Sequence, residues 1–208
     1  MLRTGRLEAF SDGVFAIAIT LLVLELSVPE DAGSDLLGAF LDQWPSYLAY
    51  VVSFVSIGAT WVAHAAITHH LQAMDSVLIR LNLILLLLVS FLPFPTGLTA
   101  RFVAEDDAAR VATVIFGLNL LLVAVAVSAL WRYAVRRGLV DTSTDAREHD
   151  VHALTQRLTP GIAGYVLLIA LGLVAPQVAV LGYLVLAIAL LVPVGRRREL
   201  RPDPPSST

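Results

Sequence analysis

The stretch that decides the fold lies near the N-terminus and reads Arg6-Leu7-Glu8-Ala9-Phe10-Ser11-Asp12-Gly13-Val14-Phe15-Ala16-Ile17-Ala18-Ile19-Thr20-Leu21-Leu22-Val23-Leu24-Glu25-Leu26. Its apolar part runs from Gly13 to Val28, with Phe10 just before it, and contains few polar residues. That length reaches the roughly 17–20 residues that a helix needs to cross a bilayer. The segment therefore predicts a membrane-spanning first helix.

The composition of the whole chain agrees with this prediction. Of 208 residues, 57% are hydrophobic and only 15% are charged, whereas soluble domains carry roughly 25% charged residues. The mean hydropathy of +0.78 means that several long segments need lipid as their solvent. A soluble enzyme is excluded, and a net charge of -3 gives no basic surface for nucleic acid. We expect an all-α, polytopic membrane protein.

Five further apolar runs predict five more spans. They cover residues 44–68, 81–98, 111–131, 162–175 and 178–194. Pro93 and Pro95 should end or kink the third span, and the last two runs, separated by Pro176 and Gln177, should form a helical hairpin. Residues 29–43 are expected to form an acidic loop. The sequence thus predicts one six-span domain over 1–195 and a disordered cytoplasmic tail over 196–208.

The arginines predict the orientation. All basic residues are arginine, and a cytoplasmic N-terminus leaves only Arg101 and Arg110 outside. Because positively charged loops stay in the cytoplasm, both termini are expected there.

Motifs for catalysis are missing from the sequence. It has no His-Glu-x-x-His, no Gly-x-Ser-x-Gly, no glycine-rich phosphate loop and no cysteine. We therefore expect no enzyme, no cofactor and no resident metal. His149 and His152 in a polar loop, and His69 and His70 at the end of the second span, have no role that the sequence can assign; solvated loop and interfacial residues are the ordinary reading.

The first span has two unlike faces in ideal helical geometry. Its apolar stripe falls within about 80° of arc and consists of Phe10, Gly13, Ile17, Leu21, Leu24 and Val28. Ser11 and Asp12 point away from the stripe, toward neighbouring helices. A carboxylate at membrane depth needs a donor on another span, and His64 and Asn82 are the candidates. The alternative is that Ser11 and Asp12 only cap a helix that begins at Gly13.

The arrangement Arg6-x-x-x-Phe10-Ser11-Asp12 at the start of a first span closely resembles the signature of the transmembrane protein 175 family of endolysosomal potassium channels. The resemblance continues in Trp61-x-x-His64, in Leu81-Asn82-Leu83 and in the segment 90–96, so it covers at least residues 6–97. The chain resembles a prokaryotic member, which implies a multi-pass protein of the inner (plasma) membrane.

The resemblance implies a potassium-selective leak channel without the Thr-Val-Gly-Tyr-Gly carbonyl filter. The first helices line a central pore, and because the motif occurs once per chain, four copies would form a homotetramer. The family's hydrophobic constriction falls at Ile17, with Leu21 and Leu24 further out on the same face. Thr20 lies beside the stripe and either bonds behind it or touches the pore. Arg6, Phe10, Ser11 and Asp12, with His64 and Asn82, are the motif and its supporting polar network.

Two other functions fit a polytopic membrane protein. A secondary transporter would use interrupted helices and midplane charge, for which Glu25 and Pro93 are the only hints. A non-conducting membrane scaffold would need neither.

Overall fold

The computed structural model describes residues 4–26, 35–141 and 161–191. The expected tail over 196–208 and the histidines His149 and His152 lie outside these ranges. Among the described residues the chain is helical, and the β pairing there is one isolated bridge between Leu71 and Val140. The prediction of an all-α fold is confirmed.

Helix α1 (Thr4–Leu21) continues into a short 3-10 helix, η1 (Leu22–Glu25). Residues 7–9, Leu-Glu-Ala, are good helix formers, so the helix starts well before Gly13. Ser11 and Asp12 therefore lie inside α1. The alternative that they cap a helix beginning at Gly13 is wrong.

The other helices follow the apolar runs closely. They are α2 (Leu36–Asp42), α3 (Trp44–His70), α4 (Ser76–Phe91), α5 (Pro93–Phe102), α6 (Asp106–Arg136), a helix at Gly161–Gly172, and α8 (Pro176–Leu191). The break between α4 and α5 falls at Leu92, directly before Pro93, as the missing N–H of proline requires.

The prediction of a loop over residues 29–43 is wrong for residues 36–42, which are helical. Leu36–Asp42 form α2, because the Asp35 carboxylate accepts a hydrogen bond from the Gly38 N–H at 3.0 Å and so caps the helix.

Within the described ranges, four helical segments are long and apolar enough to cross a membrane: Gly5–Glu25, Trp44–His70, Ser76–Phe102 and Asp107–Arg136. The last two helices form the expected hairpin but are shorter. The 16 residues of α8 extend over about 24 Å, less than the roughly 30 Å of a hydrocarbon core. The count of six spans therefore stays a prediction.

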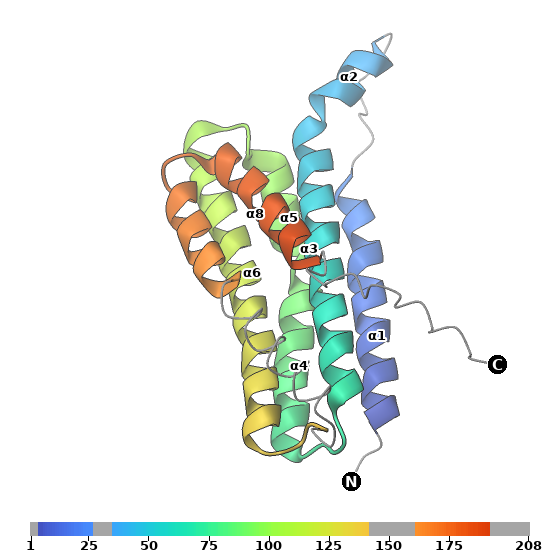
Figure 1. Ribbon diagram of the computed structural model, residues 1–208. Helices are drawn as coiled ribbons and strands as arrows, with labels where there is room; N and C mark the ends of the chain where they lie inside the picture. The colour runs from blue at the N-terminus through green and yellow to red at the C-terminus, as the bar shows by residue number, and fades with distance from the viewer. Residues whose placement is uncertain (1–3, 27–34, 142–160, 192–208) are drawn as a thin grey trace, which may run out of the picture.

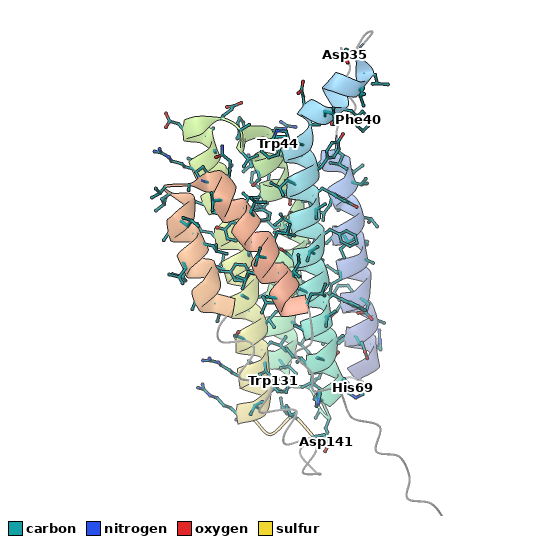
Figure 2. All side chains as sticks on the ribbon, turned by 45° about the horizontal axis from the view of Figure 1, so that its top comes forward. Asp35, Phe40, Trp44, His69, Trp131 and Asp141 are labelled. Carbon is teal, nitrogen blue, oxygen red and sulfur yellow. The ribbon has the colours of Figure 1, made fainter. Side chains whose placement is uncertain are left out.

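The long helices stand side by side, and the hairpin of Gly161–Gly172 and α8 covers only the half of α3 and α6 that is nearer α2 (Figure 1). Helix α1 packs against α3 and α4. At the opposite end the segments after α3 and α6 pair, with Gln72 N donating to Leu139 O at 2.9 Å and Asp141 N donating to His70 O at 3.0 Å. Figure 2 shows Trp131 and Asp141 gathered at this end.

Candidate functional site

The buried face of α1 attaches this helix to the rest of the subunit. Ser11, Phe15, Ala18 and Leu22 are each at most 1% exposed. Their spacing of three and four residues puts them on one side of the helix, toward α3 and α4. On the other side of α1 the side chains of Phe10, Ile17 and Leu24 are largely exposed in the single subunit.

A buried polar chain joins the three helices. Asn82 on α4 donates from Nδ2 to Ser11 Oγ on α1 at 3.0 Å, and its Oδ1 bonds to His64 Nε2 on α3 at 2.8 Å. All three residues are at most 1% exposed, and Phe15 packs its ring against His64 at 5.4 Å between centroids. Because each bond crosses between helices, the chain fixes the register of α1 against α3 and α4.

Asp12 lies beside this chain rather than within it. Its side chain is exposed in the single subunit, and its Oδ1 accepts a hydrogen bond from Trp61 Nε1 on α3 at 2.9 Å. The donor is therefore on another span, as expected, but it is Trp61 instead of His64 or Asn82. Trp61 and His64 are three residues apart and so lie on neighbouring turns of the same side of α3. His64 is joined to Ser11 through Asn82, and the indole of Trp61 reaches Asp12, the next residue of α1.

The structure does not bring Arg6 and Phe10 into the buried chain. The side chain of Arg6 is exposed, and Phe10 is 56% exposed at the start of the outward face. Within one subunit, the motif therefore divides into Ser11, which is buried, and three residues on the surface.

The apolar stripe faces out of the subunit. Ile17 is 60% exposed, Leu21 41% and Leu24 74%. The 3-10 turn of η1 matters here because residues three apart eclipse in a 3-10 helix, so Leu24 lies over Leu21. An apolar groove of about 380 Å³ runs beside Ile17, between α1 and α4.

Thr20 is next to the stripe and turned back onto its own helix. Its hydroxyl donates to the carbonyl of Ile17 at 2.9 Å. The hydroxyl proton is thus used, whereas the lone pairs of the exposed oxygen stay open to a cation.

Sequence reasoning did not include Trp61 and Phe15 among the site residues. The sequence did hold a signal for both: Trp61 lies three residues before His64 and Phe15 four residues after Ser11, which puts each aromatic residue on the same helix side as a site residue. Both residues also resemble ordinary interfacial or core aromatics, so their role became visible only through the contacts with Asp12 and His64.

Comparisons with known proteins identify the family. A family model described as "Endosomal/lysosomal potassium channel TMEM175" matches residues 6–93. A potassium channel of Streptomyces collinus is 40% identical over 208 residues, covering 98% of this chain and 100% of its own. A potassium channel of Chamaesiphon minutus is 40% identical over 188 residues, covering 89% of this chain and 92% of its own.

A solved structure extends the likeness to the fold. The crystal structure of a lysosomal potassium-selective channel TMEM175 homolog from Chamaesiphon minutus matches with a TM-score of 0.81 and 39% identity. The match covers 90% of this chain and 95% of that chain.

The fold and the site together define a multi-pass, all-helical membrane protein whose first span carries an Arg-x-x-x-Phe-Ser-Asp motif and an outward apolar stripe. The chain belongs to the TMEM175 family. The family and these relatives are channels, which confirms the prediction that the chain is not an enzyme.

Proposed function

We propose that four copies of this chain assemble into a potassium-selective leak channel whose pore is lined by α1. The observation that carries the proposal is the outward stripe of Ile17, Leu21 and Leu24, whose side chains are 60%, 41% and 74% exposed in the single subunit. One chain supplies one such helix, and a closed cyclic assembly brings the same face of each copy to the axis. We take potassium as the permeating ion because the relatives from Streptomyces and Chamaesiphon are both named as potassium channels.

Ile17 is the narrowest point in this proposal. Four isoleucine side chains at an axis offer no polar atom to replace the water around an ion, so a closed ring dewets and blocks conduction. When the ring widens, an ion must still deform its hydration shell. Potassium holds its water less tightly than sodium, and a tight apolar ring therefore favours potassium without carbonyl ligands.

The chain of Ser11, Asn82 and His64 anchors the pore helix rather than coordinating the ion. It lies on the face of α1 opposite to the stripe, fully buried in the subunit. Asp12 and Arg6 lie at the surface, where they are available to neighbouring copies in the tetramer.

We also propose that the protein lies in the inner membrane of a prokaryote with both termini in the cytoplasm. The support is the arginine distribution, since only Arg101 and Arg110 fall on the outer side. The natural chain has no cysteine, so single cysteines can be introduced directly. Labelling at Ser34→Cys from outside and at Ser207→Cys only after permeabilisation is expected; the reverse pattern would contradict the orientation.

A secondary transporter is the second candidate. The break at Leu92 between α4 and α5 and the half-buried Glu25 are the features that favour it. Purified protein in liposomes separates the two functions. A channel passes potassium down its gradient without a coupled substrate, whereas a transporter needs one and a scaffold passes nothing.

The same liposomes test the pore face. Ile17→Ala and Ile17→Asn should raise basal flux and reduce discrimination between potassium and sodium. Ile19→Ala is the matched control, because Ile19 lies about 160° away on α1 and is partly buried against the core. Wild-type flux in both Ile17 variants, or an equal effect at Ile19, would refute the assignment of this face. A mass in native lipid that corresponds to a conducting monomer would refute the tetramer.

A further inference from the structure

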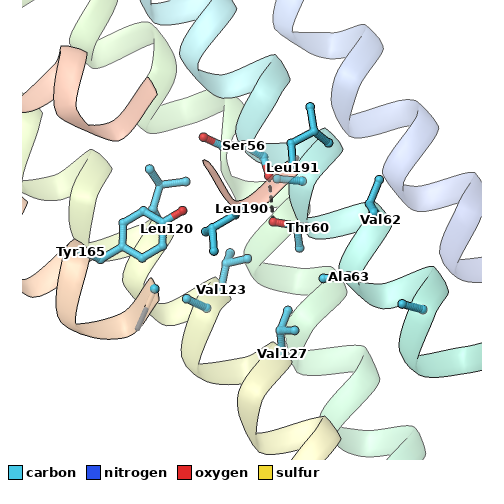
Figure 3. A pocket seen from close by; sticks show the side chains of 14 residues that line it. Ser56, Thr60, Val62, Ala63, Leu120, Val123, Val127, Tyr165, Leu190 and Leu191 are labelled. Atoms are coloured by element: carbon cyan, nitrogen blue, oxygen red, sulfur yellow. Dashed lines mark hydrogen bonds between the residues drawn. The ribbon is translucent and has the colours of Figure 1, made fainter. Parts of the chain in front are cut away.

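A second cavity lies away from the pore helix. It has a volume of about 160 Å³ and lies between α3, α6, the helix at Gly161–Gly172 and α8 (Figure 3). The described residues that line it come from these four helices and not from α1. An engineered apolar cavity of about this size, roughly 150 Å³, holds benzene. This cavity therefore has room for a molecule with about six carbon atoms.

Tyr165 offers this cavity a hydrogen-bond donor. It lies in the helix at Gly161–Gly172, is only 5% exposed, and points its hydroxyl into the cavity (Figure 3). Within the described part of the chain this hydroxyl has no hydrogen-bond partner. Buried tyrosine hydroxyls usually have one, because an unpaired polar group in apolar surroundings has lost its bonds to water. An acceptor on a bound molecule would supply the missing bond.

Two hydroxyl oxygens on α3 form the rest of the polar wall. Ser56 donates its proton to Val52 O at 2.7 Å, and Thr60 donates its proton to Ser56 O at 2.8 Å. The lone pairs of both hydroxyl oxygens stay open, so each oxygen accepts a bond from a ligand that carries a donor. The wall thus presents a donor together with acceptors, which a ligand hydroxyl matches because it can both accept and donate.

The remainder of the wall favours an uncharged, apolar ligand body. The other described lining residues are glycine, alanine, valine and leucine, and none of them is charged. A charged ligand would lose its hydration without gaining a countercharge, whereas each methylene group gains from burial. Val62 on the wall is 39% exposed, so the cavity adjoins the apolar surface of the spans, from which a molecule dissolved in the bilayer can enter.

We propose that this cavity binds a small neutral alcohol with an apolar body of about six carbon atoms. The ligand hydroxyl accepts a hydrogen bond from Tyr165, and its apolar body contacts side chains such as Ala63, Val123 and Val127. The site lies apart from the stripe on α1. The proposal therefore does not depend on the proposed ion conduction.

The test uses the full-length protein in liposomes and a butanol analogue with a diazirine on its third carbon. After illumination, mass spectrometry identifies the labelled residues, and adducts are expected at Ala63, Val123 and Tyr165. Unlabelled hexanol should suppress these adducts. Hexane at the same concentration in the membrane should compete roughly three- to tenfold less well, because it has no oxygen to bond to Tyr165.

Tyr165→Phe removes only the hydroxyl and should reduce the adducts at Val123 roughly three- to tenfold at a probe concentration below saturation. Tyr183→Phe is the matched control. Tyr183 lies on the other hairpin helix, α8, is fully buried and also has a hydroxyl without a partner in the described residues, but it does not line the cavity. This variant should label like the wild type.

Ala63→Leu fills the cavity and should reduce the adducts at Val123 several-fold. Ala189→Leu adds the same side chain at an exposed position of α8 that does not line the cavity, and should leave the labelling unchanged. Should Ala63→Leu fail to fold, the comparison of Tyr165→Phe with Tyr183→Phe decides.

Three results would overturn the proposal. The first is adducts confined to exposed positions such as Leu122, which would mean that the alcohol does not enter. The second is equal labelling of the wild type and Tyr165→Phe, which would mean that the tyrosine hydroxyl does not bind the ligand. The third is competition by hexane that is as strong as competition by hexanol.

Discussion

Replacing Asn82 by alanine tests whether the buried polar chain of Ser11, Asn82 and His64 holds α1 against α3 and α4. Asn82 is fully buried and makes two bonds to side chains of other helices, to Ser11 at 3.0 Å and to His64 at 2.8 Å. Hydrogen bonds between membrane helices contribute about 0.6–2 kcal/mol each, so Asn82→Ala should cost about 1–4 kcal/mol of unfolding free energy. It also leaves the Ser11 hydroxyl and a His64 nitrogen without a partner.

Asn119 provides a matched control. It is 4% exposed on α6 and donates one bond, to the carbonyl of Leu88 at 3.3 Å. Asn119→Ala therefore removes the same type of side chain as Asn82→Ala but only one hydrogen bond instead of two. Unfolding free energies would be measured for both variants by denaturant titration in one detergent, together with Ser11→Ala and the Ser11→Ala/Asn82→Ala double variant.

The double variant should cost less than the sum of the single variants, because both remove the same bond. Groups in contact typically show coupling of about 0.5–3 kcal/mol. Equal losses for Asn82→Ala and Asn119→Ala, together with additive effects of Ser11 and Asn82, would refute the idea that this chain stabilises α1.

Three further predictions concern Asp75 at the start of α4, Gly97 within α5 and Gly138 just after α6. The Tyr133 hydroxyl donates to the Asp75 carboxylate and, with the N–H groups that Asp75 caps, holds its pKa below the ordinary 3.8. The ionised Asp75 carboxylate therefore stabilises the folded state above about pH 3.8, and this stabilisation disappears as the pH falls through the lowered pKa. We expect the free energy of unfolding of Tyr133→Phe to be below that of the wild type at neutral pH and to approach it in acid. A Cβ at Gly97 would overlap only the carboxylate of Glu25, which is the far end of a flexible side chain and can turn away, so Gly97→Ala should change the thermal unfolding temperature little; a large loss that Glu25→Ala relieves would contradict this. Gly138 ends α6 with a φ of 63°, and Gly138→Ala should cost about 1–2 kcal/mol, whereas an unchanged unfolding temperature would contradict that strain.

Much of the fold follows from the length and period of the apolar runs. The long spans, the break at Pro93 and the C-terminal hairpin were predictable because bilayer thickness fixes how many apolar residues a helix needs. Angular counting also indicated that Ser11 would face other helices, which is how the structure places it. The outward direction of Ile17 was expected from the family resemblance, because by period alone an apolar stripe packs as well against other helices.

The partner of Asp12 was less predictable. The helical period predicts on which face of a helix a residue lies. It does not predict which side chain of a neighbouring helix is long enough to bond to that residue, because this depends on the distance between the two helices. Trp61 bonds to Asp12 because an indole extends further from α3 than the imidazole of His64, which turns to Asn82. Helix α2 was missed for a different reason, since one cap at Asp35 decides between loop and helix in so short a segment.

The uneven packing of α1 bears on how such channels diverge in evolution. Only 22% of its spanning window is buried, against 50% for α6, and the buried residues all lie on one face. Selection for a stable subunit therefore acts on Ser11, Phe15, Ala18 and Leu22, whereas on the proposal made above Ile17 and Leu24 are constrained by permeation and assembly. Substitutions on the outward face can accumulate without unfolding the subunit. We expect related channels to differ in conductance through this face while the opposite face retains its small and polar residues.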